Sequence, residues 1–341
     1  MNDIKTELKT GVFKRAYVFF GEEEYLRTSY EKRLTDALMP EDVRLMDLNV
    51  IDGKQYRASD LSAACETPPL AAEYRLTVFK DTGLFASGKK DETEAAERIL
   101  SAFFAAGERS TNVVLFSESA VDKRGRLYKI IDKAGGATEF KTPPEKQLIG
   151  WAAGIFKKEG YAIEASAAAL LVRYASDMRQ IVMETEKLIA YKGDDRVIRE
   201  ADIELICAQS LEYKIFGLIG LIGAKKCSEA VITYQKLIAA KESPLGILNL
   251  MARQFGIMLR CSELAKQGKN AYEAASLLKL ADFAASEAFR QSRLFAPDTL
   301  YAAYAECLDT DVRIKTGNIT DKTGVELLII KYSKTEVKHA L

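Results

Sequence analysis

Residues 1–141 alternate between two hydrophobic periods, and this alternation restricts the possible folds more than any other feature of the chain. Short apolar runs, typical of strands, occur over 17–20, 43–48, 76–79, 113–116 and 138–140. Between them, apolar residues recur at the spacing of amphipathic helices, over 22–39, 56–65, 92–104 and 122–133. Strands that alternate with helices predict a parallel sheet covered by helices on both faces.

The rest of the chain predicts helices alone. Thr142-Pro143-Pro144 ends the last predicted strand, because proline cannot continue a strand and suits the start of a helix. Helical patterns follow over 145–160, 166–174, 177–191, 200–209, 213–224, 228–240, 244–268, 282–292, 299–315 and 323–332. Ser243-Pro244 is a start signal for one of these helices, whereas Pro297-Asp298 predicts a turn. The fold class is therefore α/β plus all-α, with an α/β domain at 1–141, a small helical bundle at 142–210 and a larger helical domain at 211–341.

The composition excludes several classes of function. Lys+Arg and Asp+Glu both number 49, so the net charge is zero, whereas a protein that binds nucleic acid alone is usually basic. The only histidine is His339, which argues against a His-based catalytic triad and against a Cys/His zinc site. The five cysteines are scattered without C-x-x-C spacing, which predicts free thiols.

The sequence predicts a cytoplasmic protein with no membrane contact. Charged residues Asp3, Lys5 and Glu7 lie where a signal peptide would need an apolar run. No apolar stretch reaches the roughly 20 residues that a membrane-spanning helix needs.

One loop resembles a nucleotide-binding loop. Gly83, Gly88 and Lys89 match G-x-x-x-x-G-K, but the next residue is Lys90 instead of the Ser or Thr that holds Mg²⁺. The next helix is predicted to begin after Lys90-Asp91-Glu92, with Asp91 as its cap, so its N–H groups would not face a phosphate. We predict that this loop does not bind nucleotide; an active ATPase that uses residues 83–89 is the alternative.

The turn after the first strand is acidic. In nucleotide-binding α/β domains this turn holds the phosphates, but here it reads Gly21-Glu22-Glu23-Glu24. The carboxylates would repel a phosphate, and they suit the N-terminal end of a helix instead. Glu118, which follows another apolar strand, is interpreted as a cap for the next helix.

Five segments in order along the chain resemble the delta subunit family of the bacterial DNA polymerase III clamp loader. They are YVFFGEEEYL at 17–26, ACETPPLAAEYRLTVFKD at 64–81, SDMRQIVMETEKLIAY at 176–191, SPLGILNLMARQFGIMLR at 243–260 and LYAAYAECLDTDVRIKTG at 300–317. The resemblance implies an AAA+-type domain with a degenerate nucleotide site, a lid-like bundle and a C-terminal collar. A helical scaffold protein unrelated to replication is the second alternative.

The resemblance also implies a role. Such a subunit binds and opens the ring-shaped beta sliding clamp so that the clamp can be placed on primed DNA. It has no ATPase activity or other catalysis of its own and needs no cofactor, although it belongs to a DNA-directed DNA polymerase holoenzyme. The implied partners are the beta clamp, the ATPase (gamma/tau) and delta-prime subunits through the collar, and primer-template DNA within the complex.

Matching to the family places the clamp-binding loop at Thr67-Pro68-Pro69-Leu70-Ala71. Thr67 precedes a proline, so the helix must stop there, and the two prolines stiffen the exit. The residues alone favour the alternative that Leu70 covers the core of its own domain, whereas the resemblance implies that Leu70 is an apolar anchor for the clamp. Some family members carry Phe where this chain has Ala71.

Other residues are candidates for the same partners. Tyr74, or Leu84 and Phe85, are alternative apolar contacts that could compensate for Ala71. Arg313 and Lys315 are candidates for contact with primer-template DNA, and the alternative is that they form a solvated helix end.

Overall fold

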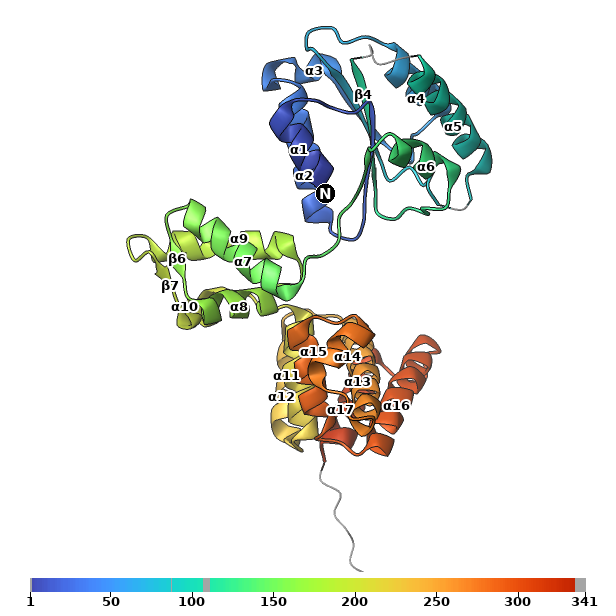
Figure 1. Ribbon diagram of the computed structural model, residues 1–341. Helices are drawn as coiled ribbons and strands as arrows, with labels where there is room; N and C mark the ends of the chain where they lie inside the picture. The colour runs from blue at the N-terminus through green and yellow to red at the C-terminus, as the bar shows by residue number, and fades with distance from the viewer. Residues whose placement is uncertain (1, 87, 107–110, 335–341) are drawn as a thin grey trace, which may run out of the picture. The chain divides into compact units, whose positions relative to one another are not determined.

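The computed structural model describes residues 2–86, 88–106 and 111–334, and it divides into two compact units between Thr142 and Pro143 (Figure 1). The first unit contains one parallel sheet in the strand order β2-β3-β4-β1-β5. Its strands are β1 (Ala16–Phe20), β2 (Leu48–Asp52), β3 (Arg75–Lys80), β4 (Asn112–Glu118) and β5 (Ala137–Glu139). The central strands β1 and β4 are buried along their whole length, as expected for strands covered on both faces.

Helices cover both faces of this sheet, as the sequence predicts. On one face lie α1 (Asn2–Thr10) and α2 (Glu24–Leu38), and their core includes Tyr17, Phe19 and Leu34 (Figure 1). On the other face lie α4 (Ala58–Glu66), α5 (Lys90–Ala105) and α6 (Arg126–Lys133). The short helices η1 (Glu41–Val43) and α3 (Arg44–Asp47) connect α2 to the edge strand β2.

One strand of this unit was predicted at the wrong place, and one helix was not predicted. Residues 43–48 were expected to form a strand, but most of them form η1 and α3, and the strand is Leu48–Asp52. Two apolar residues of this run lie on the surface: Leu45 is 98% exposed and Met46 is 56% exposed. The N-terminal helix α1 was not predicted; it places Ile4 in the core.

The second unit begins with a small bundle. It consists of α7 (Glu145–Lys158), α8 (Ala165–Tyr174), α9 (Met178–Lys192) and α10 (Glu200–Ile206), with a core that includes Phe156, Leu171 and Leu188. The expectation of helix alone is wrong at β6 (Ala162–Ile163) and β7 (Val197–Ile198), which pair in parallel. Two-residue strands are too short to produce a periodic pattern.

Within the described part of this unit, up to residue 334, seven further helices surround a separate core that includes Met251, Phe255 and Leu300. They are α11 (Leu211–Gly223), α12 (Cys227–Ala239), α13 (Pro244–Lys266), α14 (Ala271–Leu278), α15 (Asp282–Ser292), α16 (Pro297–Lys315) and α17 (Asp321–Ser333). The two separate cores support our proposal that the predicted division at residues 210 and 211 separates two domains. Helix α14 was not predicted, and Pro297 begins α16 instead of forming a turn.

Two local predictions are confirmed. The side chain of Ser243 accepts the N–H of Gly246 at 3.3 Å and so caps α13, with Pro244 in its first turn. All five cysteines are free. Across the described part of the chain, no single helix has the length and apolar character needed to cross a membrane, although the bent pair α10 and α11 meets these two criteria together.

Candidate functional site

The turn between β1 and α2 is closed by the protein itself. Gly21 has φ +123°, and a Cβ atom at this position would lie 2.2 Å from the carbonyl oxygen of Phe140. Glu23 is the N-cap of α2, and its buried carboxylate accepts the N–H of Tyr25 at 3.2 Å. The prediction that the acidic residues form the helix N-terminus is confirmed for Glu23, the N-cap, and Glu24, the first helical residue, while Glu22 precedes the helix. The helix end that would bind a phosphate is capped by a protein carboxylate.

The glycine loop after β3 also directs its backbone N–H groups to a protein carboxylate. Glu118 accepts the N–H of Thr82 at 2.9 Å, the N–H of Gly83 at 3.3 Å and the Thr82 hydroxyl. The interpretation of Glu118 as a cap for the next helix is therefore wrong, because its carboxylate bonds to the glycine loop. Burial raises the pKa of Glu118, although these hydrogen bonds act in the opposite direction.

A second prediction about this loop is wrong. Helix α5 begins at Lys90, and its N-cap is Lys89 instead of Asp91. The expected gap between Lys89 and the helix is therefore not present. The absence of a Ser or Thr hydroxyl at position 90 remains as the argument against Mg²⁺ binding. Residue 87 of this loop lies outside the described residues.

The segment that was matched to the clamp-binding loop lies between α4 and β3. Thr67 ends α4 in an extended conformation (φ −79°, ψ 117°), as its position before a proline predicts. Thr67, Pro68 and Ala71 are exposed and Pro69 is half-buried. The side chain of Leu70 is 74% exposed, so the alternative that it covers the core of its own domain is wrong.

Of the alternative apolar contacts, Leu84 and Phe85 are buried in the core, 1% and 4% exposed, and are not available to a partner. Tyr74 is half-buried and makes an edge contact with Phe13, with 6.0 Å between ring centroids. Leu45 and Met46, whose exposure the sequence pattern does not predict, add exposed apolar area on α3. Helix α3 is connected through Asp47 to the Leu70 loop, which is residues 67–74 between α4 and β3.

Asp47, the last residue of α3, is fully buried and binds the backbone of the loop. Its Oδ1 accepts the N–H of Leu70 at 2.6 Å, and its Oδ2 accepts the N–H groups of Ala71 and Ala72, each at 2.7 Å. Nη1 of Arg75 lies 3.6 Å from Oδ1. Burial alone would raise the pKa of Asp47, but the N–H groups of Ala72, Leu70 and Ala71, together with Arg75, hold it below its ordinary value.

The two candidates for DNA contact lie in the last turn of α16. Nη1 of Arg313 is 3.9 Å from Oδ2 of Asp309, and Nζ of Lys315 is 2.7 Å from Oδ2 of Asp311. Both basic side chains are exposed, but each lies beside a carboxylate that offsets part of its charge. Their contact with DNA remains a prediction.

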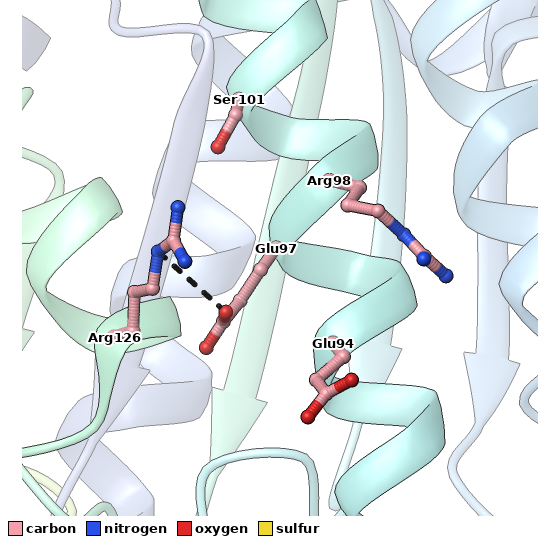
Figure 2. Close-up of a pocket in the computed structure, with 5 residues that line it drawn as sticks. All are labelled: Glu94, Glu97, Arg98, Ser101 and Arg126. Carbon is pink, nitrogen blue, oxygen red and sulfur yellow. Dashed lines mark ion pairs between the residues drawn. The ribbon is translucent and has the colours of Figure 1, made fainter.

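A surface pocket of about 440 Å³ lies beside α5 and α6, and Figure 2 shows the side chains that line it. They are Glu94, Glu97, Arg98, Ser101 and Arg126. Arg126 Nε lies 3.7 Å from Glu97 Oε2, while Arg98 points away from this pair. Ser101 has no histidine or lysine beside it among these residues that could act as a base. Over the described ranges, no group of three or more His, Cys, Asp or Glu side chains is arranged to hold a metal ion.

The sheet and the helical region that follows define an AAA+-like domain joined to a C-terminal helical domain, as predicted. Residues 17–141 match the family model of the DNA polymerase III delta subunit, and residues 212–332 match the model of the C-terminal domain of that subunit. The chain belongs to the DNA polymerase III delta subunit family, which confirms the resemblance and excludes an unrelated helical scaffold.

A Bacillus subtilis sequence and a solved Bacillus subtilis structure are similar over almost the whole chain. DNA polymerase III subunit delta is 28% identical over 341 residues, which cover 99% of this chain and 98% of that protein. The solved structure of the DNA clamp loader delta protein (YqeN) is 26% identical and has a TM-score of 0.65, covering 98% of this chain and 99% of that chain.

Proposed function

We propose that this chain is the clamp-binding subunit of a clamp loader: it binds a beta sliding clamp through the Leu70 loop and opens the ring without hydrolysing ATP. The observation that carries the proposal is the position of Leu70. Its side chain is 74% exposed, although the N–H of the same residue is bonded to a buried carboxylate. A large apolar side chain that a fixed backbone presents to solvent is typical of an interface anchor.

The energy available from this anchor is modest. Burying one Leu side chain contributes about 1.5–3 kcal/mol, which corresponds to roughly ten- to a hundredfold in affinity. Ala71 adds little apolar area, so exposed neighbours such as Leu45 and Met46 on α3 would have to supply more of the contact.

Opening the ring requires no chemistry in this subunit. A ring interface has a closed and an open state, and a ligand that binds the open state more tightly shifts the population toward it. The acid-capped β1–α2 turn supports the absence of nucleotide hydrolysis, because Glu23 occupies the helix end that a phosphate would need.

The C-terminal helical domain would join the ATPase (gamma/tau) and delta-prime subunits. Helix α16 carries Tyr301, Leu308 and Val312, which are 65%, 50% and 56% exposed. Their spacing places them on one face of the helix. An exposed apolar stripe of this kind supports helix packing against neighbouring subunits, while Arg313 and Lys315 at the end of the same helix would face primer-template DNA.

The test is the affinity of purified protein for its own beta clamp. Leu70→Asp should weaken binding at least about tenfold, because an apolar contact is lost and a carboxylate must be desolvated. Leu205→Asp is the matched control, since Leu205, on α10 of the other unit, is a leucine of similar exposure, 68%. Both variants should keep the wild-type thermal transition. Clamp affinity that is unchanged by Leu70→Asp would refute the role of the loop.

A further inference from the structure

The Leu70 loop has no regular secondary structure, yet three of its consecutive N–H groups converge on one side chain. The donors are Leu70, Ala71 and Ala72, and the acceptor is the carboxylate of Asp47, at 2.6 Å, 2.7 Å and 2.7 Å. Successive N–H groups that point at one anion form a compact anion-binding concavity of the backbone. Here the anion belongs to the protein and comes from a different element, α3.

The burial of Asp47 makes this contact selective for one loop conformation. The side chain of Asp47 is 0% exposed with the loop in place, so a loop that moves away would lose three hydrogen bonds to a carboxylate. Arg75 approaches the same carboxylate at 3.6 Å and also donates to the carbonyl oxygen of Met46 at 3.3 Å. The first residue of β3 therefore joins the loop and α3 in one hydrogen-bonded network.

The backbone N–H and the side chain of Leu70 lie in different environments. Its N–H points inward to Asp47, whereas its side chain remains 74% exposed. Pro68 and Pro69 stiffen the chain just before this point. The loop backbone is thus fixed from within, and the anchor side chain is left available to a partner.

We infer that Asp47 is a positioning residue that holds the loop in its clamp-binding conformation, an inference that rests on the proposed function. Without the carboxylate, the loop would sample other conformations, and part of the binding energy would be spent on ordering it. If the bound conformation were populated only a tenth to a hundredth of the time, the apparent Kd would rise about ten- to a hundredfold.

Asp47→Asn is the variant that tests this role, because it keeps the shape of the side chain. Both carboxylate oxygens accept N–H groups, so an amide NH₂ would face a donor on one side in either orientation. Asp36→Asn is the matched control: Asp36 is an exposed carboxylate that pairs with Arg44 of α3 at 2.6 Å. Its ion pair is with Arg44, outside the loop, so this variant should leave clamp affinity unchanged.

Two measurements are made on the full-length protein: amide hydrogen exchange and affinity for the beta clamp. In the wild type, the amides of Leu70, Ala71 and Ala72 should be protected despite their place in an exposed loop. In Asp47→Asn these amides should exchange faster while β3 and β4 stay protected, and the Kd for the clamp should rise about ten- to a hundredfold.

Several results would overturn the inference. Unprotected wild-type amides at 70–72 would do so without any variant, even if Asp47→Asn failed to fold. Wild-type clamp affinity in Asp47→Asn, with protection at 70–72 lost, would show that loop order does not matter for binding. If the wild type did not bind the clamp at all, the proposed function itself would fail, and protection of the three amides would then mark Asp47 as a structural residue only.

Discussion

The carboxylate of Glu118, at the end of β4, accepts the backbone N–H of Thr82 at 2.9 Å. It also accepts the N–H of Gly83, the first glycine of the G-x-x-x-x-G-K match. A phosphate-binding loop must offer its N–H groups to the ligand. In this chain the start of the loop already bonds to a carboxylate of the protein, and Leu84 and Phe85 are buried in the core.

We therefore predict no nucleotide binding at this loop. A titration with a fluorescent ATP analogue should show no saturable, Mg²⁺-dependent signal at millimolar concentrations, and Lys89→Ala should behave like the wild type. Saturable binding that needs Mg²⁺ and is lost in Lys89→Ala would restore the ATPase alternative.

Gly21→Ala should strongly destabilise the first unit. The added Cβ would lie 2.2 Å from the Phe140 carbonyl oxygen, and φ +123° is a conformation that side chains rarely adopt. The expected loss is more than about 2 kcal/mol in the free energy of unfolding. Gly11→Ala is the control, since Gly11 also has positive φ (+73°) but no atom within 4 Å of an added Cβ. Equal effects in denaturant unfolding of the two variants would contradict the close approach at Gly21.

Leu308→Asp should weaken assembly with the ATPase and delta-prime subunits. Leu308 is the central residue of the exposed stripe on α16, and a carboxylate there would have to lose its hydration in the interface. Size-exclusion chromatography of the mixed subunits should show dissociated protein, while affinity for the clamp alone remains at the wild-type value. Normal assembly would show that this face of α16 is not the subunit interface.

The sequence predicts the strands that are buried on both faces of the sheet. It also predicts the helices in which the apolar spacing repeats over many residues. β1, β3 and β4 contain apolar runs because helices cover both faces. β2 was misplaced because it is an edge strand whose Val50 is 55% exposed, so it has no such run. Helix α14 was missed since eight residues give little periodic signal.

The candidate site is predicted less completely. Family matching placed Thr67–Ala71, and the two prolines explain why the helix ends there. The contact of Asp47 with the loop could not be found, because the two are 23 residues apart in sequence and come together only in the fold. The role of Glu118 was missed for the same reason, since its partner Thr82 is 36 residues away.

Release of a closed beta clamp from nicked circular DNA tests the central claim most directly. If binding of the Leu70 loop shifts the ring toward its open state, the purified chain should release the clamp without any nucleotide. Leu70→Asp should release it far more slowly, whereas Leu205→Asp should match the wild type. A wild-type protein that binds the clamp but leaves it on the DNA, or a Leu70→Asp variant that releases it equally fast, would contradict the account.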